Sequence, residues 1–374
     1  FNKVIQHAVK GKSSIYPEPP AYQFKLIHVN ILKANDERLK ELSKKGQLFL
    51  NIDEMRTIRG YFRKLKREPT DCELETIAQT WSEHCKHKIF NARIDYHEPE
   101  GRVQRIDSLF NSYIKRATEE IRRTMGEKDW CVSVFKDNAG VIRFNEDWNV
   151  VFKVETHNSP SALDPYGGAL TGIVGVNRDP FGTGKGAKLI FNVDTFCFAP
   201  PDYSKPLPPR LLHPKRIYEG VREGVEHGGN KSGIPTVNGS IVFDDRYAGK
   251  PLVYCGTGGI TPRMILGEPS HKKQAKPGDR IVMTGGRIGK DGIHGATFSS
   301  EELHEESPTS AVQIGDPITQ KRMTDFLLRA RDLGLYHAIT DNGAGGLSSS
   351  VGEMAQDCNG CRMDLERAPL KYSG

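Results

Sequence analysis

The stretch Val150-Val151-Phe152-Lys153-Val154-Glu155-Thr156-His157-Asn158-Ser159 combines the pattern of a strand with the side chains of a reactive site. Its apolar members Phe152 and Val154 alternate with polar ones. Because successive side chains of an extended chain point to opposite faces, Lys153, Glu155 and His157 are predicted to share one face. A phosphate-pairing amine, a possible metal ligand and a base then lie within one short segment. This segment predicts a site.

Helical patterns precede this strand, at residues 36–45 and 53–66. Thr70-Asp71-Cys72-Glu73 is a capping box that begins a third helix. This helix is expected to continue through Trp81-Ser82-Glu83-His84-Cys85, because apolar side chains recur at helical spacing at Leu74, Ile77, Ala78, Trp81 and Cys85. His84 lies near that apolar face. It is either a core histidine or, since the residues that follow are too polar for a deep core, a residue at the rim of a cleft.

The chain changes to short strands from about residue 131. Strands are predicted at 131–135, 149–154, 170–176, 188–193, 240–243 and 252–257, and helices at 108–125 and 214–226. This pattern predicts an α+β domain with a mixed sheet and helices on one face. A second α+β domain is predicted from a strand at 280–284, a helix at 318–333, a strand at 337–340 and a helix from Ser348.

These patterns divide the chain into four parts. We expect an irregular leader at 1–35, a helical linker at 36–95, a first α+β domain at 96–262 and a second, incomplete domain at 263–374. No apolar run approaches the roughly 20 residues that span a bilayer, and no signal peptide is visible. The sequence thus predicts a cytoplasmic protein without a membrane partner.

Cysteine and charge exclude two further classes of site. Of the seven cysteines only Cys358 and Cys361 have a CxxC spacing. A closed zinc site needs four ligands, so reduced thiols are expected. Residues 1–67 carry 15 Lys and Arg against 6 Asp and Glu within a chain of net charge +6. These charges lie on amphipathic helical patterns without a basic-aromatic module, which favours a solvated or subunit-facing surface over nucleic acid.

Arg178 and Asp179 directly follow the predicted strand at 170–176. At a strand end an arginine can bind a phosphate while a carboxylate holds a cation. The pattern is equally typical of an ion pair between Arg178 and Asp179 on the surface. The loop Phe181-Gly182-Thr183-Gly184-Lys185-Gly186-Ala187-Lys188 comes next, and its alternating glycines suit an anion. It is not a P-loop, because no Ser or Thr follows Gly184-Lys185 and the spacing differs.

Two further turns complete the candidate site. Asp341-Asn342-Gly343-Ala344-Gly345-Gly346-Leu347 leads into a helix, as either a binding turn or an ordinary connection. Gln313-Ile314-Gly315-Asp316-Pro317 is a similar turn. Three carboxylates near predicted strand ends are expected to gather around one divalent cation: Glu155, Asp179 and Asp341. Magnesium binds few carboxylates plus phosphate oxygens. With Lys153, Arg178 and Lys185, the sequence indicates ATP-dependent phosphoryl transfer without a P-loop.

These motifs together resemble the formylglycinamide ribonucleotide amidotransferase family, also called phosphoribosylformylglycinamidine synthase or PurL. The resemblance covers about residues 50–374 and is closest to the large, multidomain form. It rests on Pro69-Thr70-Asp71, Trp81 to Cys85, Lys153 to Ser159, Arg178-Asp179 with the glycine loop, Gly229-Asn230, Gly233-Ile234-Pro235-Thr236, Gln313 to Pro317 and Asp341 to Leu347. It implies a helical linker followed by an aminoimidazole ribonucleotide synthetase-like (PurM-like) N-terminal domain and an incomplete PurM-like C-terminal domain.

The resemblance also implies an activity and residue roles. The family is a ligase of purine biosynthesis: ATP phosphorylates the amide oxygen of formylglycinamide ribonucleotide, and ammonia then displaces phosphate to give the amidine. By motif position the catalytic residues are His84 and, as general base, His157, and the magnesium ligands are Glu155, Asp179 and Asp341. ATP contacts fall on Lys153, on His87 (where the small form has tyrosine) and, from the glycine loop, on Gly184, Lys185 and Gly186. Substrate contacts fall on Thr156, Asn158, Ser159, Arg178 and Gln313.

The family has two synthetase halves and takes ammonia from a glutaminase domain or subunit, so this chain is expected to be a fragment that is inactive alone. Its first residues resemble the end of a PurS-like module. Two alternatives stay open: another enzyme of the superfamily, such as selenophosphate synthetase or thiamine monophosphate kinase, and a non-catalytic nucleotide-binding scaffold. The capped helix ending at Cys85 speaks against the first. Against a non-catalytic scaffold that has lost its active site, the chain keeps His84, Glu155, His157 and Asp179.

Overall fold

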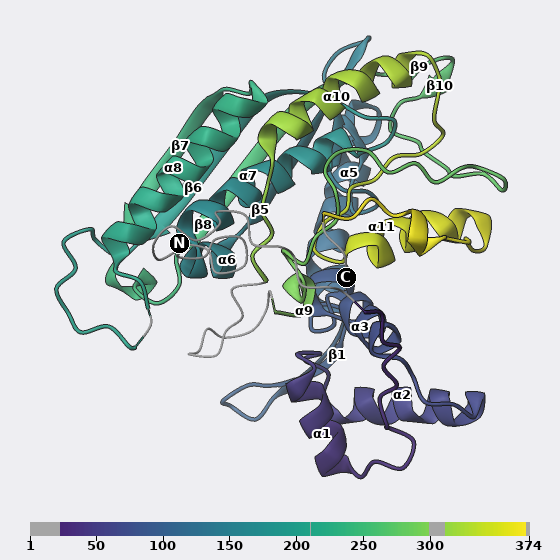
Figure 1. The fold of residues 1–374 in the computed structure, drawn as a ribbon. Coiled ribbons are helices and arrows are strands. Elements are labelled where there is room, and N and C mark those ends of the chain that lie inside the picture. Colours follow the sequence, from purple (N-terminus) through teal and green to yellow (C-terminus); the bar gives the residue numbers. More distant parts are fainter. Residues whose placement is uncertain (1–22, 210, 299–310, 372–374) are drawn as a thin grey trace, which may run out of the picture.

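The computed structural model describes residues 23–209, 211–298 and 311–371, so the first 22 residues of the predicted leader lie outside it. The described chain begins with a small helical unit (Figure 1), whose helices are α1 (Asp36–Lys45), α2 (Ile52–Leu65), α3 (Asp71–Thr80) and the single turn α4 (Glu83–Lys86). The predicted capping box is present, since the Thr70 hydroxyl accepts from the Glu73 amide and the Glu73 carboxylate accepts from the Thr70 amide. The unit has its own core of Ile31, Leu39, Met55, Ile58, Phe62, Leu74 and Ala78.

The third helix is shorter than predicted and ends at Thr80 rather than Cys85. The Ser82 side chain explains the break. Its hydroxyl donates to the Gln79 carbonyl at 2.8 Å and accepts from the Cys85 amide at 3.2 Å. Serine favours such local bonds over a helix interior, and here it caps the new turn α4. His84 therefore lies on a separate turn, outside the apolar face of α3.

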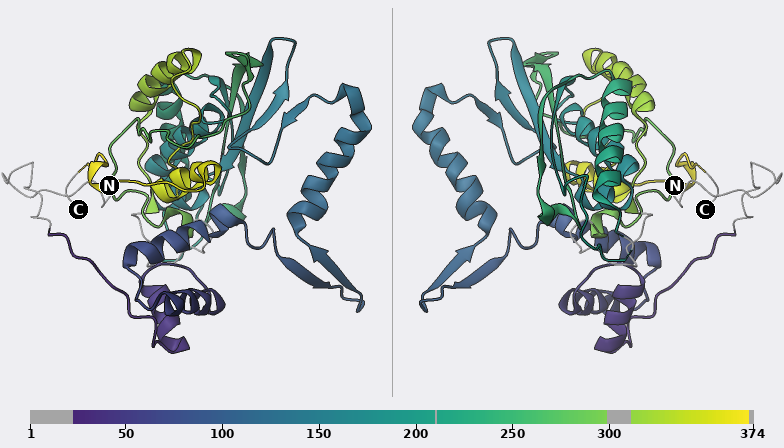
Figure 2. Two further views of the ribbon diagram at one scale, coloured as in Figure 1. Left: turned by 90° about the vertical axis from the view of Figure 1, so that its right-hand side faces the viewer. Right: turned by 90° about the vertical axis from the view of Figure 1, so that its left-hand side faces the viewer.

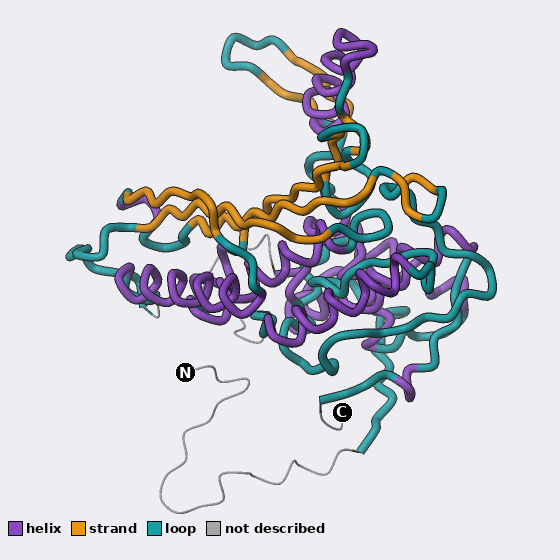
Figure 3. The backbone as a smooth tube through the Cα atoms, turned by 90° about the horizontal axis from the view of Figure 1, so that it is seen from above, coloured by secondary structure: helices purple, strands orange, loops and turns teal. Residues whose placement is uncertain are grey.

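A six-stranded mixed sheet forms the centre of the molecule, as predicted. Its order is β3-β4-β5-β8-β6-β7; β6 and β7 are parallel and the other neighbours antiparallel. Figure 3 shows the helices packed on one face of this sheet. The strands are β3 (Cys131–Ser133), β4 (Gly140–Arg143), β5 (Trp148–Thr156), β6 (Lys188–Phe198), β7 (Thr236–Phe243) and β8 (Leu252–Pro262). On the opposite face of the sheet Phe152 is 38 % exposed.

The predicted strand at 170–176 is wrong: these residues belong to the helix α7 (Pro165–Phe181). The Asp164 side chain caps this helix by accepting from the Gly167 amide at 3.0 Å, and Pro165 occupies its first turn. The run is apolar on every side because α7 is enclosed by the sheet and by α8 (Pro214–Ser232). A short apolar run of this kind does not distinguish a buried strand from a buried helix.

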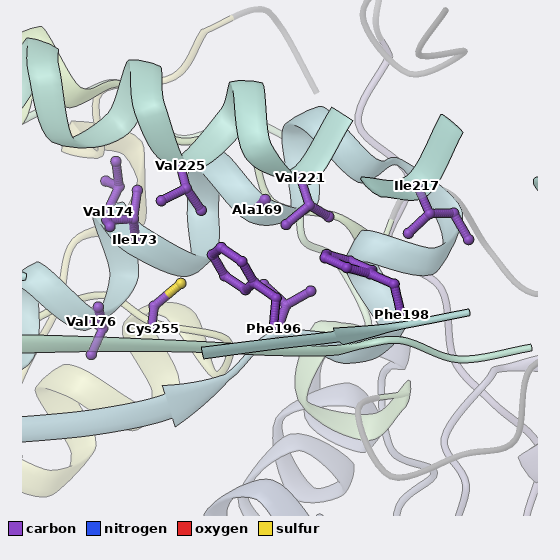
Figure 4. Packing of buried hydrophobic residues seen from close by; sticks show 11 residues of the cluster. Ala169, Ile173, Val174, Val176, Phe196, Phe198, Ile217, Val221, Val225 and Cys255 are labelled. Carbon is purple, nitrogen blue, oxygen red and sulfur yellow. The ribbon is translucent and has the colours of Figure 1, made fainter. Parts of the chain in front are cut away.

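Large side chains of the sheet fill the space below these two helices (Figure 4). Phe196, Phe198, Val253 and Cys255 pack against a helical layer formed by Ala169, Ile173, Val174, Ile217, Val221 and Val225. Glycines let the helices approach closely. A Cβ added at Gly228 would lie 2.1 Å from the Ile173 side chain. Packing against the sheet thus fixes the position of α7 over β5, and with it the positions of Arg178 and Asp179.

A hairpin and a helix project from this body in Figure 2. They are β1 (Arg93–His97), β2 (Val103–Asp107), a π-helical turn (Phe110–Lys115) and α5 (Arg116–Met125). The helix was predicted at 108–125. Among the described helices, none has both the length and the apolarity needed to cross a bilayer.

The second domain packs its helices against the first domain but lacks the strands predicted at 280–284 and 337–340. A strand needs a hydrogen-bonded neighbour, and within the described part of this domain no segment pairs with either run. Ile281 and Val282 remain exposed. Its elements are the pair β9 (Met264–Ile265) and β10 (Glu268–Pro269) and the helices α9 (Gly295–Phe298), α10 (Pro317–Asp332) and α11 (Gly346–Ala355). The helices predicted at 318–333 and from Ser348 are thus confirmed.

Gly224→Ala is expected to destabilise the protein, because the added Cβ would lie 2.5 Å from the Tyr166 carbonyl oxygen and 3.0 Å from the Leu170 amide nitrogen. These are backbone atoms of α7, and overpacking of this kind costs about 1–3 kcal/mol. Denaturant unfolding followed by circular dichroism measures the loss. Gly60→Ala in α2 is the matched control, since nothing lies within 4 Å of its new Cβ. Equal losses in both variants would contradict the close packing of α7 and α8.

Candidate active site

Lys153 joins two carboxylates that come from different elements. Its ammonium nitrogen lies 3.2 Å from Glu155 Oε2 on the same strand and 3.5 Å from Asp179 Oδ2 on α7. Lys153 and Glu155 therefore share one face of β5, as predicted, and α7 crosses that face. Burial lowers the pKa of Lys153, but the charges of Asp179 and Glu155 outweigh it and raise the pKa overall. Burial raises the pKa of Glu155, but the charges of Lys153 and His84 outweigh it and lower the pKa overall.

The second domain contributes the third carboxylate. The Asn138 amide nitrogen donates to Asp179 Oδ1 at 3.3 Å and to Asp341 Oδ1 at 2.9 Å. Burial raises the pKa of Asp179 to about 7 against the attraction of Lys153, and the negative charges of Asp341 and Glu155 add to the shift. An excess of negative charge therefore lies where the two domains meet.

Glu155, Asp179 and Asp341, with Lys153 and Asn138 between them, form a cluster. Arg178 connects this cluster to the predicted substrate-binding turn at Gln313. Its Nε lies 3.3 Å from Asp341 Oδ2, and its Nη2 donates to Gln313 Oε1 at 3.3 Å. The Thr171 hydroxyl donates to the Gln313 carbonyl at 2.5 Å and fixes that turn to α7. Arg178 and Asp179 thus project from a helix rather than a strand end, but they still reach the site.

His157 is held as a neutral base directly after β5. Its Nδ1 bonds the Gly168 carbonyl, which can only accept, so Nδ1 carries the proton and Nε2 keeps its lone pair. Burial lowers the pKa of His157 to about 4, against the effects of Gly168 and Glu155. The neighbouring Ser159 hydroxyl is buried and has no hydrogen-bond partner among the described residues. Asn158 has a structural bond, since its Oδ1 accepts from the Val253 amide at 2.8 Å.

His84 reaches the cluster from the helical linker. Its Nε2 lies 3.9 Å from Glu155 Oε1. The hydrogen bond with Cys85 raises the pKa of His84 against the effect of burial, and the charge of Glu155 adds to it. Burial raises the pKa of Cys85, but the bond with His84 lowers it overall. His87 ends the same turn in a left-handed conformation with φ 51°, and its side chain is exposed.

The glycine loop is occupied by protein contacts. The Gly184 amide donates to Asp137 Oδ2 at 2.8 Å, the Lys185 amide donates to the Ser270 carbonyl at 2.8 Å, and the Gly186 amide donates to the Thr183 carbonyl at 2.9 Å. The Lys185 ammonium pairs with Glu268. These amides therefore bond protein acceptors, among them the Asp137 carboxylate, and the predicted ATP contacts of Gly184, Lys185 and Gly186 stay a prediction.

Two residues at the site were not predicted. Asn138 bridges the carboxylates, and Lys273 lies 2.6 Å from Asp137 Oδ1 while donating to the Gly182 and Ile339 carbonyls at 2.7 and 2.9 Å. The sequence holds a signal for the first: Asp137 and Asn138 follow a predicted strand closely, as Arg178 and Asp179 seemed to do. Lys273 lies in a lysine-rich loop and has no such signal.

The expectation that the three carboxylates surround one cation is not met in this geometry. In the described part of the chain, no three His, Cys, Asp or Glu side chains are close enough to hold a metal ion together. Lys153 separates Glu155 from Asp179, and Asn138 separates Asp179 from Asp341. The oxygen donors and the raised pKa of Asp179 nevertheless fit a hard cation whose remaining ligands come from a phosphate.

Family models match most of the chain. The formylglycinamide ribonucleotide amidotransferase linker domain matches residues 39–88. The AIR synthase related protein N-terminal domain matches residues 136–261, and the C-terminal domain of the same group matches residues 276–373. This order of a linker followed by the N- and C-terminal AIR synthase related domains confirms the fold class predicted from the sequence.

Individual relatives agree with these models. The PurL subunit of phosphoribosylformylglycinamidine synthase from Thermoplasma acidophilum is 38% identical over 348 residues, which cover 92% of this chain and 42% of that protein. The solved structure of Thermotoga maritima PurL complexed with FGAR has a TM-score of 0.62 and 32% identity, and the match covers 83% of this chain and 43% of that one. The same protein complexed with ATP has a TM-score of 0.55 and 27% identity, with coverage of 83% and 41%.

The chain spans about two-fifths of the length of the curated relatives it matches. The matched linker and domain pair, and the identity to PurL subunits, confirm the resemblance carried by the motifs. The chain belongs to the formylglycinamide ribonucleotide amidotransferase family, of which it contains the linker domain and one pair of AIR synthase related domains.

Proposed function

We propose that this chain forms a synthetase active site that converts formylglycinamide ribonucleotide to formylglycinamidine ribonucleotide with ATP and ammonia. The observation that carries the proposal is the bridging of carboxylates from both domains by Lys153 and Asn138, with His84 and His157 near Glu155. Phosphoryl transfer depends mainly on positioning and on neutralising charge. The cluster supplies both.

In the proposed reaction the γ-phosphoryl group of ATP moves to the amide oxygen of the substrate. Ammonia then attacks the amide carbon, the C–O bond breaks, phosphate leaves and one proton is lost from the nitrogen. We infer that Lys153 pairs with an ATP phosphate. We also infer that the substrate is contacted by Arg178 and Gln313 and by Thr156, Asn158 and Ser159. The free Nε2 of His157 accepts the proton from nitrogen.

Magnesium would be held by Asp179 and Asp341, with Glu155 nearby, and it would neutralise the ATP phosphates. The protein needs few ligands for this, because Mg²⁺ commonly binds one or two carboxylates plus phosphate oxygens. We infer that His87 contacts ATP from the exposed end of α4. The glycine loop stays a weaker prediction for the reason given above.

The remaining half of the synthetase and a glutaminase that supplies ammonia are the proposed partners, in the cytoplasm. A solved structure titled PurLQS from Thermotoga maritima, at a TM-score of 0.55, favours a multi-subunit assembly. The 374 residues alone are expected to be inactive. Steady ATP- and ammonia-dependent amidine formation by the isolated chain would contradict that expectation without contradicting the site.

Mg²⁺ is expected to stabilise the chain more at pH 8 than at pH 5. The pKa of Asp179 lies near 7, above its usual 3.8, so its stabilising effect is present below about pH 4 and is lost as pH rises through 7. A bound cation should offset that loss and, in a chain of 374 residues, raise the melting temperature by about 1–2 °C per kcal/mol of binding free energy. Thermal unfolding with and without Mg²⁺ measures it.

Asp179→Asn should remove the Mg²⁺ response and the part of the pH dependence that Asp179 contributes. Asp325→Asn is the matched control, because Asp325 lies on α10 in an exposed ion pair with Lys321. An unchanged Mg²⁺ response in the Asp179 variant would remove that carboxylate from the proposed cation site.

His157→Ala is expected to lower kcat by roughly 10²- to 10⁴-fold, the usual contribution of a positioned general base. The assay uses the natural polypeptide that carries these residues, with formylglycinamide ribonucleotide, ATP, Mg²⁺ and ammonium chloride, and follows ADP and amidine. His97→Ala on the exposed strand β1 is the control and should keep full activity. Turnover that survives in the His157 variant would refute its role as base.

A further inference from the structure

The thiol of Cys85 lies between two side chains from different parts of the chain. Its sulfur is 3.8 Å from His84 Nδ1 and 3.7 Å from the Ser349 hydroxyl oxygen on α11. The Cys85 amide donates to the Ser82 hydroxyl at 3.2 Å, which holds the turn in place. Neither Cys85 nor Ser349 has a part in the proposed reaction. Together they connect the second domain to the histidine of the linker.

The partners on the two sides of the His84 ring decide which nitrogen carries a proton. Glu155 faces Nε2 at 3.9 Å, and its carboxylate can only accept a hydrogen bond when ionised. The thiol faces Nδ1 and can donate to it. If the proton instead moves from sulfur to Nδ1, the ring becomes a cation and keeps its Nε2 proton. In both states Nε2, the ring nitrogen 3.9 Å from Glu155 Oε1, carries a hydrogen.

The α11 helix and the α4 turn pack closely, so the Ser349 and Cys85 side chains have little room to move. A Cβ added at Gly345 would lie 1.7 Å from the Ser349 hydroxyl oxygen and 3.6 Å from the Cys85 sulfur. A second contact lies close by, where His294 Nδ1 is 3.0 Å from Glu75 Oε1 on α3. The second domain therefore contacts the linker at two points. One of them is the contact of Ser349 with Cys85, whose sulfur also contacts His84.

We propose that Cys85 and Ser349 are positioning residues that hold His84 in the tautomer with its proton on Nε2. The second domain thereby sets the direction in which His84 donates. The effect of this tautomer on the reaction rests on the proposed function. Under that function, the Nε2 hydrogen of His84 would face the region where the phosphoryl group is transferred. The tautomer itself does not depend on any activity.

Nitrogen-15 NMR of the chain labelled at histidine, without added metal, tests the tautomer directly. His84→Gln assigns the signal. We expect Nε2 of His84 to show the shift of a protonated ring nitrogen. A wild-type signal with the proton on Nδ1 and none on Nε2 would overturn the proposal before any positioning variant is made.

Cys85→Ala should convert His84 to a mixture of tautomers, with both nitrogen shifts moving toward averaged values, whereas Cys85→Ser should restore the wild-type pattern. Cys72→Ala, an exposed cysteine on α3, is the control for loss of a thiol. Ser349→Ala keeps the proposal testable if Cys85→Ala does not fold, and it should show a smaller shift in the same direction. Unchanged His84 shifts in the folded variants would refute the positioning role.

An activity measurement separates this inference from the proposed function. In the natural polypeptide, Cys85→Ala should lower kcat about tenfold with little change in KM, as expected when one oriented hydrogen bond of about 1.4 kcal/mol is lost. Altered NMR shifts with unchanged kcat would keep the positioning role and remove His84 from catalysis. Unaltered shifts would remove the positioning role whatever the rate.

Discussion

The concentration of negative charge between the two domains is the constraint on which the site depends. Glu155 comes from β5, Asp179 from α7 and Asp341 from the second domain, and Lys153 and Asn138 connect them. Desolvated carboxylates repel one another and disfavour their charged forms unless a cation or a hydrogen-bond donor lies between them. Lys153 supplies the cation and Asn138 the donor. The cluster therefore exists only while both domains are packed together.

Polar contacts along the glycine loop hold the domains in that arrangement. Arg331 Nη1 donates to the Gly186 carbonyl at 2.8 Å, and the Tyr336 hydroxyl donates to the Lys185 carbonyl at 2.8 Å. Gly184 has φ 58°, and an added Cβ would lie 2.3 Å from the Ser270 carbonyl oxygen. The glycines thus permit a close approach between two parts of the protein. The same sequence suggested an approach to a phosphate, since both uses need exposed backbone and a left-handed conformation.

Local chemistry predicted much of this fold, and contacts between distant segments explain what it missed. Alternation along β5 correctly placed Lys153 and Glu155 together, and the capping box correctly began α3. The apolar run at 170–176 was assigned to a strand because its burial on all sides depends on α8, which lies some forty residues later. Asn138 bonds a residue 203 positions away. A local sequence pattern does not indicate so distant a partner, so the bridging role of Asn138 could be found only from the structure.

Under the proposed function, charge balance requires that a nucleotide bind this cluster together with a divalent cation. The three carboxylates face two permanent cations, Lys153 and Arg178, so the site already has an excess of negative charge. Burial is the main reason that the pKa of Asp179 is raised, and the charges of Asp341 and Glu155 add to it. A triphosphate alone would add several further negative charges at a distance where Coulomb repulsion is strong. A hard cation bound by Asp179 and Asp341 would reverse that balance and free Lys153 to pair with phosphate. The nearly neutral, base-competent His157 beside this charge is then suited to proton transfer rather than to binding the anion.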